Sequence, residues 1–242
     1  MKIKKENVNA LLDTRFIKVY DLQYEEGKHY FDATRRNLEE IVAIKSESEA
    51  QKMLPDAVSS FVILKVKNEE PRLLLFQEYR YPAGRFLLSV PAGLIDKEDI
   101  EQIKAGEGTE PNVLKADELE KLRELNREVI LRTAKREIME ETGLTIKPTD
   151  KLEVVSPFAY STPGMTDESN AIVCAVVELE SEKELEVLNQ NGAVGSERFD
   201  GFELVTEDTA RKILKNGCDN KGDYYSIYTW AALTWFTTGL WK

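Results

Sequence analysis

The stretch that most constrains this chain is residues 136–144, Arg-Glu-Ile-Met-Glu-Glu-Thr-Gly-Leu. On a helix, Glu137, Glu140 and Glu141 are spaced i, i+3 and i+4, so their side chains project from one face. Like charges at this spacing destabilise a bare helix, so we expect a positive group in front of them. A hard divalent cation that prefers oxygen ligands fits best, although these residues alone also allow a solvated acidic face. Gly143 is typical of the residue that ends a helix.

The sequence before this stretch favours a cation site over a solvated acidic face. Glu128 lies eight residues before Arg136, with Arg132 between them, so we expect a long Glu–Arg contact along the helix. Further upstream is the segment Pro-Ala-Gly-Leu-Ile-Asp at residues 91–96. Together these segments resemble the Nudix box, which has a glycine, a spaced glutamate and then Arg-Glu-hydrophobic-x-Glu-Glu-x-Gly-hydrophobic. Glu137, Glu140 and Glu141 are called the box glutamates below.

The departure from the family pattern lies upstream of Glu128. The family has five residues between the glycine and the first glutamate, whereas residues 94–127 separate Gly93 from Glu128 here. We interpret residues 97–127 as an insertion that splits the box, because Pro91-Ala92-Gly93 resembles the segment entering the box in ADP-ribose pyrophosphatases. The alternative places Leu122 at the glycine position. We expect the apolar stripe that begins in this segment to pack in the core. Covering the mouth of the site and making a subunit contact are further roles that the sequence leaves open.

Composition excludes several classes of function. The net charge of −11 argues against non-specific binding to nucleic acid or to an anionic membrane. Two cysteines are too few for a disulfide framework and indicate a reducing compartment. No secretory signal and no run long enough to span a bilayer is evident, so we expect a cytoplasmic protein. His29 is the only histidine, which disfavours a His-containing triad.

The order of patterned segments predicts an α/β fold. We expect a Nudix-type mixed β-sheet sandwiched between helices, with an N-terminal β-hairpin extension. The predicted domains are residues 1–57, as an extension that contributes a dimer contact, and residues 58–242, as the Nudix hydrolase domain with its insertion. Residues 1–14 read as a polar lead-in. The predicted helices cover about 117–142, 206–214 and 224–238, with a break near Asn126 left open in the first.

Two other segments resemble ADP-ribose pyrophosphatases. Residues 77–82, Gln-Glu-Tyr-Arg-Tyr-Pro, place Arg80 where an arginine of those enzymes contacts the phosphates of the substrate. Residues 157–170 resemble their Ser-Pro-Gly-x-Thr-x-Glu loop, in which the glutamate activates the attacking water, and Glu168 falls on that position. The alternatives are a surface cation for Arg80 and a solvated turn for Glu168.

The resemblance implies a site that holds Mg²⁺ or Mn²⁺. The implied metal ligands are Glu137, Glu141, Glu140 and the main-chain carbonyl of Ala92. Arg136 would orient the glutamates through Glu128, and Glu168 would be the general base, with Glu140 as the alternative. The implied substrate-binding residues are Arg80, Arg36 (or Arg35) and Gly93.

The implied reaction is hydrolysis of a pyrophosphate bond, with ADP-ribose giving AMP and ribose 5-phosphate. The family usually has an acidic residue two positions before the proline of Pro-Ala-Gly, where this chain has Ser89. Another nucleoside diphosphate sugar or a dinucleotide is therefore an alternative substrate. A second alternative is a Nudix-like sensor that binds a metabolite without cleaving it. The implied partners are a small nucleoside diphosphate and a second copy of the chain, with no nucleic acid and no membrane.

Overall fold

The computed structural model describes residues 3–104, 116–190 and 197–242. The chain forms two compact units. The first unit comprises Met1–Asp56, Thr109–Asn126 and Phe158–Asn170. The second unit comprises Ala57–Gly108, Arg127–Pro157 and Ala171–Lys242. Each unit is described by itself below.

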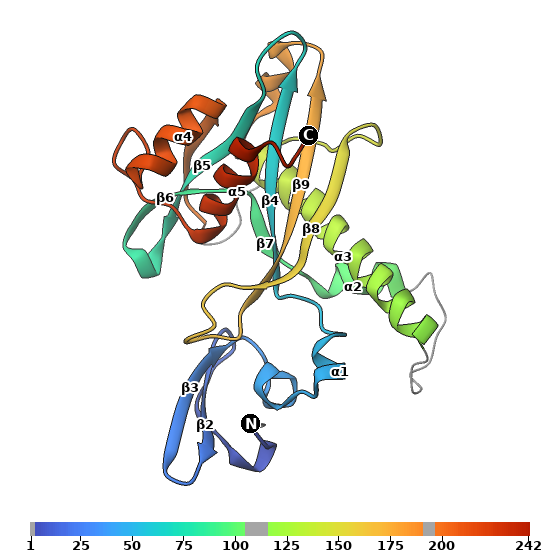
Figure 1. Cartoon of the computed structure of the whole chain (residues 1–242), viewed down its shortest axis with the longest axis vertical. Coiled ribbons are helices and arrows are strands. Elements are labelled where there is room, and N and C mark those ends of the chain that lie inside the picture. The colour runs from blue at the N-terminus through green and yellow to red at the C-terminus, as the bar shows by residue number, and fades with distance from the viewer. Residues whose placement is uncertain (1–2, 105–115, 191–196) are drawn as a thin grey trace. The chain divides into compact units, whose positions relative to one another are not determined.

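A mixed seven-stranded sheet forms the centre of the second unit, with the strand order β10-β5-β4-β9-β8 (Figure 1). β6 pairs with β5 and β7 pairs with β4, outside that path. Antiparallel register places Val62 of β4 opposite Leu74 of β5, and Val58 of β4 opposite Gly93 of β7. The strands are β4 (Ala57–Val66), β5 (Arg72–Arg80), β6 (Arg85–Ser89), β7 (Ala92–Leu94), β8 (Lys151–Tyr160), β9 (Ser169–Leu179) and β10 (Phe199–Val205).

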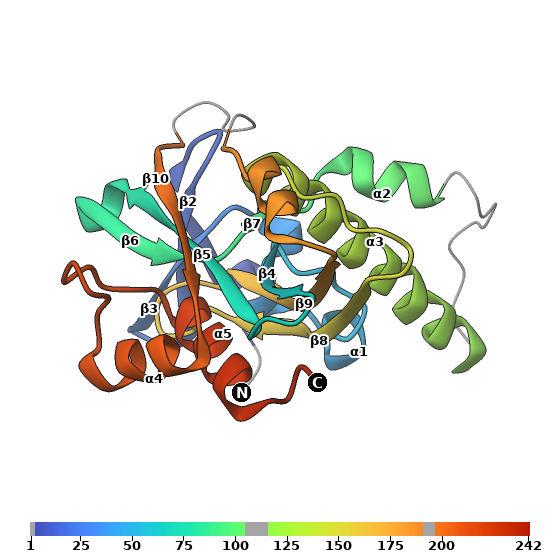
Figure 2. The same cartoon turned by 90° about the horizontal axis from the view of Figure 1, so that it is seen from above.

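Helices cover both faces of this sheet. Alternate side chains of a strand point to opposite faces, so apolar strands such as β4 need a packing partner on each side. On one face, Phe61 and Ile63 of β4 pack with α4 (Glu207–Asn216) and α5 (Ile227–Thr238). On the other face, Val62 and Leu64 pack in the same cluster as Ile138 of α3 (Ala116–Thr142). Figure 2 shows α3 and the α4–α5 pair on opposite sides of the strands. A further helix, α2 (Lys97–Lys104), follows β7.

The first unit contains a separate three-stranded sheet in the order β1-β2-β3. Its strands are β1 (Val8–Asp13), β2 (Lys18–Glu25) and β3 (Lys28–Thr34), and all neighbours are antiparallel. Val8, Tyr20, Leu22 and Ile41 form its small buried core. Three 3₁₀ turns, η1 (Lys5–Asn7), η2 (Leu38–Glu40) and η3 (Val42–Ile44), and the short helix α1 (Glu47–Ala50) complete the segment. Two further 3₁₀ turns of the chain are η4 (Tyr81–Ala83) and η5 (Glu182–Val187).

The predicted fold class is confirmed. The helix expected at 117–142 is α3, and it is continuous past Asn126. The prediction of a polar lead-in at residues 1–14 was wrong, because β1 lies there and pairs with β2. Its exposed apolar residues, such as Leu11 and Leu12, give no alternating pattern that would have marked a strand.

None of the described helices combines the length and apolarity needed to cross a lipid bilayer.

Candidate functional site

The last turns of α3 present the box glutamates in the second unit. Glu137 and Glu141 are 8% and 5% exposed, whereas the Glu140 side chain is 43% exposed. The helix ends as the sequence predicts, with Gly143 at φ 76° and its N–H donating to the carbonyl of Met139 at 2.9 Å. Two buried carboxylates one turn apart are costly to maintain unless charge compensates them.

Strand β7 brings two of the predicted residues against this helix. The N–H of Ala92 donates to Oε2 of Glu141 at 2.9 Å. A Cβ atom built on Gly93 would lie 1.9 Å from Cδ of Glu137, so only glycine leaves room for that carboxylate. This close approach supports Gly93 as the glycine of the split box. It also gives Gly93 the role of accommodating Glu137.

Arg136 does not bind Glu128, and the prediction of that contact was wrong. Eight residues along a helix correspond to a rise of about 12 Å, which is too far for a direct Glu–Arg contact. Glu128 is exposed, whereas Arg136 donates through Nη2 to Asp99 at 3.0 Å and through Nε to the same oxygen at 3.3 Å. Thr133 also donates to this oxygen of Asp99, at 3.1 Å. Asp99, which is 4% exposed, therefore anchors Arg136.

Asp99 also explains how the box is split. Residues 94–98 separate it from Gly93, which is the five-residue spacing between the box glycine and the first box acid. The predicted insertion, residues 97–127, includes Asp99. Counting six positions forward from Gly93 would have found it.

Arg136 also holds two of the box glutamates. Its Nη1 lies 2.7 Å from Oε1 of Glu137 and 3.1 Å from Oε2 of Glu140. Its Nη2 donates to the main-chain carbonyl of Leu94 at 2.9 Å. The guanidinium of Arg136 thus links the box glutamates of α3, the end of β7 and Asp99 in one network.

Burial changes the protonation of the glutamates. Burial raises the pKa of Glu137 to about 7, with Arg136 opposing the rise and Glu140 adding to it. Burial also raises the pKa of Glu141 well above its usual value, and the N–H of Ala92 opposes that rise. The charges of Glu137, Glu78 and Glu197 add to it. Both carboxyl groups therefore hold a proton more readily than an exposed glutamate does.

This donor set suits a hard divalent cation. Buried carboxylates supply the oxygen ligands that Mg²⁺ and Mn²⁺ prefer, and a cation would lower the raised pKa values. In the ranges that the structure describes, no three His, Cys, Asp or Glu side chains are already arranged as a metal site. Arg136 Nη1 contacts Glu137 and Glu140, so a cation would compete with the guanidinium for these oxygens.

Arg80 lies at the end of β5 in the same unit. Its Nη2 is 2.6 Å from Oε2 of Glu78, which is 7% exposed, and its own side chain is 48% exposed. Burial raises the pKa of Glu78, and Arg80 opposes the rise. The role of Arg80 in binding phosphate stays a prediction. Sequence reasoning missed Glu78, although its position two residues before Arg80 places both side chains on one face of the strand.

Glu168 belongs to the first unit, in the loop of residues 161–169, called the Glu168 loop below. Its side chain is 40% exposed and lies near Nε of Arg35 at 3.8 Å. The hydroxyl of Ser161 donates to its Oε2 at 3.1 Å. The loop is tied to β3 by the N–H of Ala33, which donates to the carbonyl of Met165 at 3.0 Å. Its role as general base stays a prediction.

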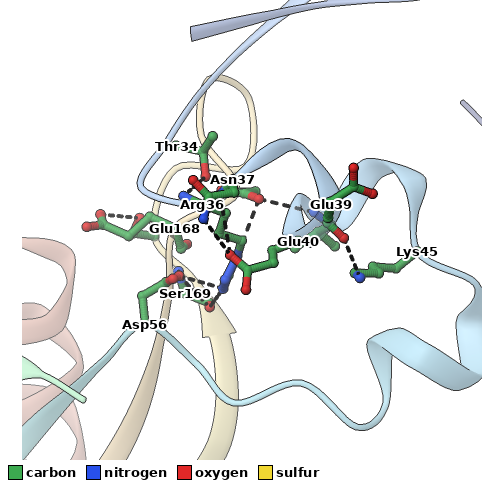
Figure 3. A network of polar contacts seen from close by, with 12 residues as sticks. Thr34, Arg36, Asn37, Glu39, Glu40, Lys45, Asp56, Glu168 and Ser169 are labelled. Carbon is green, nitrogen blue, oxygen red and sulfur yellow. Dashed lines mark hydrogen bonds and ion pairs between the residues drawn. The ribbon is translucent and has the colours of Figure 1, made fainter. Parts of the chain in front are cut away.

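Arg36 is not placed to bind a substrate phosphate. Its side chain is 10% exposed and lies 2.8 Å from Asp56 and 3.4 Å from Asp167, whose side chains are 12% and 9% exposed. Figure 3 shows the end of the Arg36 side chain in contact with both Asp56 and Ser169. Its charge is committed to these carboxylates, so the geometry corrects the predicted role. Arg35 was the alternative candidate for this role, and its side chain is 52% exposed.

Comparisons with known proteins identify the family of this chain. Residues 55–219 match the family model described as NUDIX domain. A curated relative, ADP-ribose pyrophosphatase of Bacillus subtilis (strain 168), is 26% identical over 162 residues. That match covers 67% of this chain and 64% of the relative, which is less than two thirds of its length. A solved structure described as an ADP compounds hydrolase matches with a TM-score of 0.52 and 17% identity, covering 100% of this chain and 94% of that chain. The last likeness concerns the fold alone.

Proposed function

Because this chain belongs to the NUDIX domain family, we propose that it is a metal-dependent pyrophosphohydrolase. Its substrate is a nucleoside diphosphate linked to another moiety, and ADP-ribose is cleaved to AMP and ribose 5-phosphate. The observation that carries the proposal is the pair of buried carboxylates, Glu137 and Glu141, on one helical turn with Gly93 packed against the first. The curated ADP-ribose pyrophosphatase relative supports the choice of substrate.

The proposed mechanism follows from the charge of the substrate. A pyrophosphate is anionic and repels nucleophiles, so catalysis depends on positioning and on charge neutralisation. Glu137, Glu141, Glu140 and the carbonyl of Ala92 would hold a Mg²⁺ or Mn²⁺ ion, and such an ion would supply that charge neutralisation.

The remaining groups position the substrate and move protons. Arg136, anchored by Asp99, holds Glu137 and Glu140 in place. Glu168 accepts the proton of the attacking water as general base, and Glu140 is the alternative. Arg80 and the exposed Arg35 bind phosphate oxygens, as guanidinium forks do.

A second candidate substrate class rests on Ser89. This residue is 4% exposed and stands where an acidic residue is usual in ADP-ribose pyrophosphatases. A smaller, uncharged side chain at this place favours another nucleoside diphosphate sugar or a dinucleotide. The candidate from another class is a sensor that binds without cleavage, but retention of all box glutamates disfavours it.

A hydrolysis screen with Mg²⁺ or Mn²⁺ tests the proposal. ADP-ribose, several nucleoside diphosphate sugars and dinucleoside polyphosphates are incubated with the protein, and the products are identified by mass. We expect AMP and ribose 5-phosphate from ADP-ribose. Absence of turnover across the whole panel would refute the enzyme proposal, and binding of ADP-ribose without products would favour the sensor.

The assembly and location are further proposals. We infer a cytoplasmic homodimer in which the extension of residues 1–57 contacts its partner and residues 58–242 carry the activity. Exposed apolar side chains in this extension, including Leu11, Phe16 and Phe31, support a contact there. Light scattering on the intact chain tests the dimer, because a monomer at micromolar concentration contradicts it.

A further inference from the structure

Glu168 is flanked by two residues that buried charges hold in place. On one side, Oδ2 of Asp167 accepts the N–H of Val42 at 3.1 Å and lies 3.4 Å from Nε of Arg36. On the other side, the N–H and the hydroxyl of Ser169 both donate to Oδ2 of Asp56 at 2.9 Å. The backbone is therefore fixed immediately before and immediately after Glu168.

Arg36 connects these two anchors. Its Nη2 donates to Oδ2 of Asp56 at 2.8 Å and to the hydroxyl of Ser169 at 3.2 Å (Figure 3). The main-chain N–H of Arg36 donates to the hydroxyl of Thr34 at 3.0 Å, and this bond ties Arg36 to the end of β3. The side chains of Arg36, Asp56 and Asp167 are 10%, 12% and 9% exposed, so these contacts are shielded from water. Shielded, charge-assisted hydrogen bonds are stronger than exposed ones.

The side chain of Glu168 itself is left exposed. It contacts the hydroxyl of Ser161 and lies 3.8 Å from Arg35, and 40% of it is accessible to solvent. The contrast is between a firmly held backbone and an accessible carboxylate. A general base needs both, because proton abstraction requires a fixed position within reach of water.

We propose that Arg36 is a positioning residue: by binding Asp56, Ser169 and Asp167 together, it fixes the backbone that presents Glu168. This inference rests on the proposed function and on Glu168 as its base. Arg36 acts through Glu168 and contacts no substrate. Its guanidinium is planar and reaches both anchors at once, whereas an ammonium group is a point charge.

The choice of variants follows from burial. Arg36→Met leaves Asp56 and Asp167 buried without their cation, and this variant can fail to fold. Arg36→Lys keeps the charge and removes the fork, and Ser169→Ala removes one hydroxyl from the network. Arg15→Lys is the matched control, because Arg15 is an exposed arginine of the same unit that lies over the ring of Phe16 at 5.2 Å.

The first measurement does not depend on activity. Amide hydrogen exchange of peptides covering residues 161–170 is compared among the intact wild-type protein, Arg36→Lys, Ser169→Ala and Arg15→Lys. We expect exchange in this segment to rise about tenfold in the first two variants and to remain unchanged in Arg15→Lys. Unchanged protection in Arg36→Lys would overturn the anchoring.

The second measurement separates positioning from general stability. Against ADP-ribose with Mg²⁺, Arg36→Lys should lower kcat about tenfold to a hundredfold and leave KM within about twofold, since a displaced base affects the chemical step. The same substitution in a Glu168→Gln background should cost no further activity, because the group that Arg36 positions is already lost. Losses that multiply in the double variant would overturn the proposal.

The two levels of the inference fail differently. If the wild-type protein turns over nothing on the panel while exchange still responds to Arg36→Lys, the proposed function is refuted and the anchoring stands. If the wild-type protein is active and Glu168→Gln retains full activity, the hydrolase stands and the positioning role is refuted.

Discussion

Arg136 donates to Asp99, an acid 37 positions earlier in the chain, with Nη2 3.0 Å from Oδ2. The same guanidinium contacts Glu137 through Nη1 at 2.7 Å. Asp99 thus sets the position of the arginine, and the arginine sets the position of a box glutamate. The contact spans the split in the box, so the helix and the end of β7 are joined despite the residues inserted between them.

Asp99→Asn should lower both stability and activity. Loss of the buried charge weakens two hydrogen bonds from Arg136 and one from Thr133, at a cost of about 1–3 kcal/mol. Glu128→Gln is the matched control, and an exposed substitution should change stability by less than about 0.5 kcal/mol. Denaturant unfolding and turnover of ADP-ribose measure both effects. A larger loss of stability and turnover in Glu128→Gln than in Asp99→Asn would contradict this role of Asp99 and favour Glu128 as the residue that orients Arg136.

Gly93→Ala should impair activity more than stability. The new Cβ would lie 1.9 Å from Cδ of Glu137, but a carboxylate at the end of a flexible side chain can move away at modest cost to the fold. The displaced glutamate can no longer hold an ion as proposed. We expect at least a tenfold loss of turnover and a higher Mn²⁺ concentration for half-maximal activity. Wild-type metal dependence in this variant would refute the importance of the close approach.

Glu137→Gln should abolish most of the activity and remove the stabilisation that metal confers. A neutral amide avoids the cost of a buried charge, so the metal-free variant should be as stable as the wild-type protein at pH 8, or more stable. We expect turnover to fall at least a hundredfold and Mn²⁺ to stabilise the variant less than the wild-type protein. Thermal unfolding with and without Mn²⁺ measures the second effect. Glu178→Gln, at an exposed glutamate that pairs with Lys65, is the control.

The metal-free protein should lose stability as the pH rises from about 4.5 to about 7. The pKa of Glu137 is raised to about 7 by burial, so the folded state binds more protons than the unfolded state in this window, and stability falls with pH. Burial also raises the pKa of Asp32 to about 6, with the same sign, in the first unit. Thermal unfolding in a chelator should therefore give a higher Tm at pH 5 than at pH 8, by about 3 °C or more.

Two comparisons check the cause of this pH dependence. Glu137→Gln should flatten the dependence between pH 5 and pH 7, because it removes one titrating group. Saturating Mg²⁺ should raise the Tm more at pH 8 than at pH 5, since protons compete with the metal for carboxylates. A Tm that rises steadily with pH in the chelated protein contradicts the assigned pKa shift of Glu137.

Residue spacing along the chain was enough to predict the helix that carries the box glutamates, its end at Gly143 and the α/β class. These features depend on local spacing or on periodicity. Spacing of i, i+3 and i+4 places carboxylates on one face of a helix. An alternating or continuous apolar pattern marks a buried strand without reference to its neighbours in the sheet. The Pro91-Ala92-Gly93 motif also predicted that Gly93 belongs to the same site as the box glutamates. The first strand, β1, did not follow, because its mostly exposed residues give no buried pattern and only pairing with β2 defines it.

Which charged side chains meet depends on the packing of distant segments. Asp99 replaced Glu128 as the partner of Arg136 because the contact depends on how the chain returns after β7, and spacing along α3 carries no information about that return. Arg36 and Arg35 are adjacent in sequence and chemically identical, yet Arg36 is buried between Asp56 and Asp167 while Arg35 is half exposed. Long-range packing sets burial, and burial is what distinguishes these two arginines.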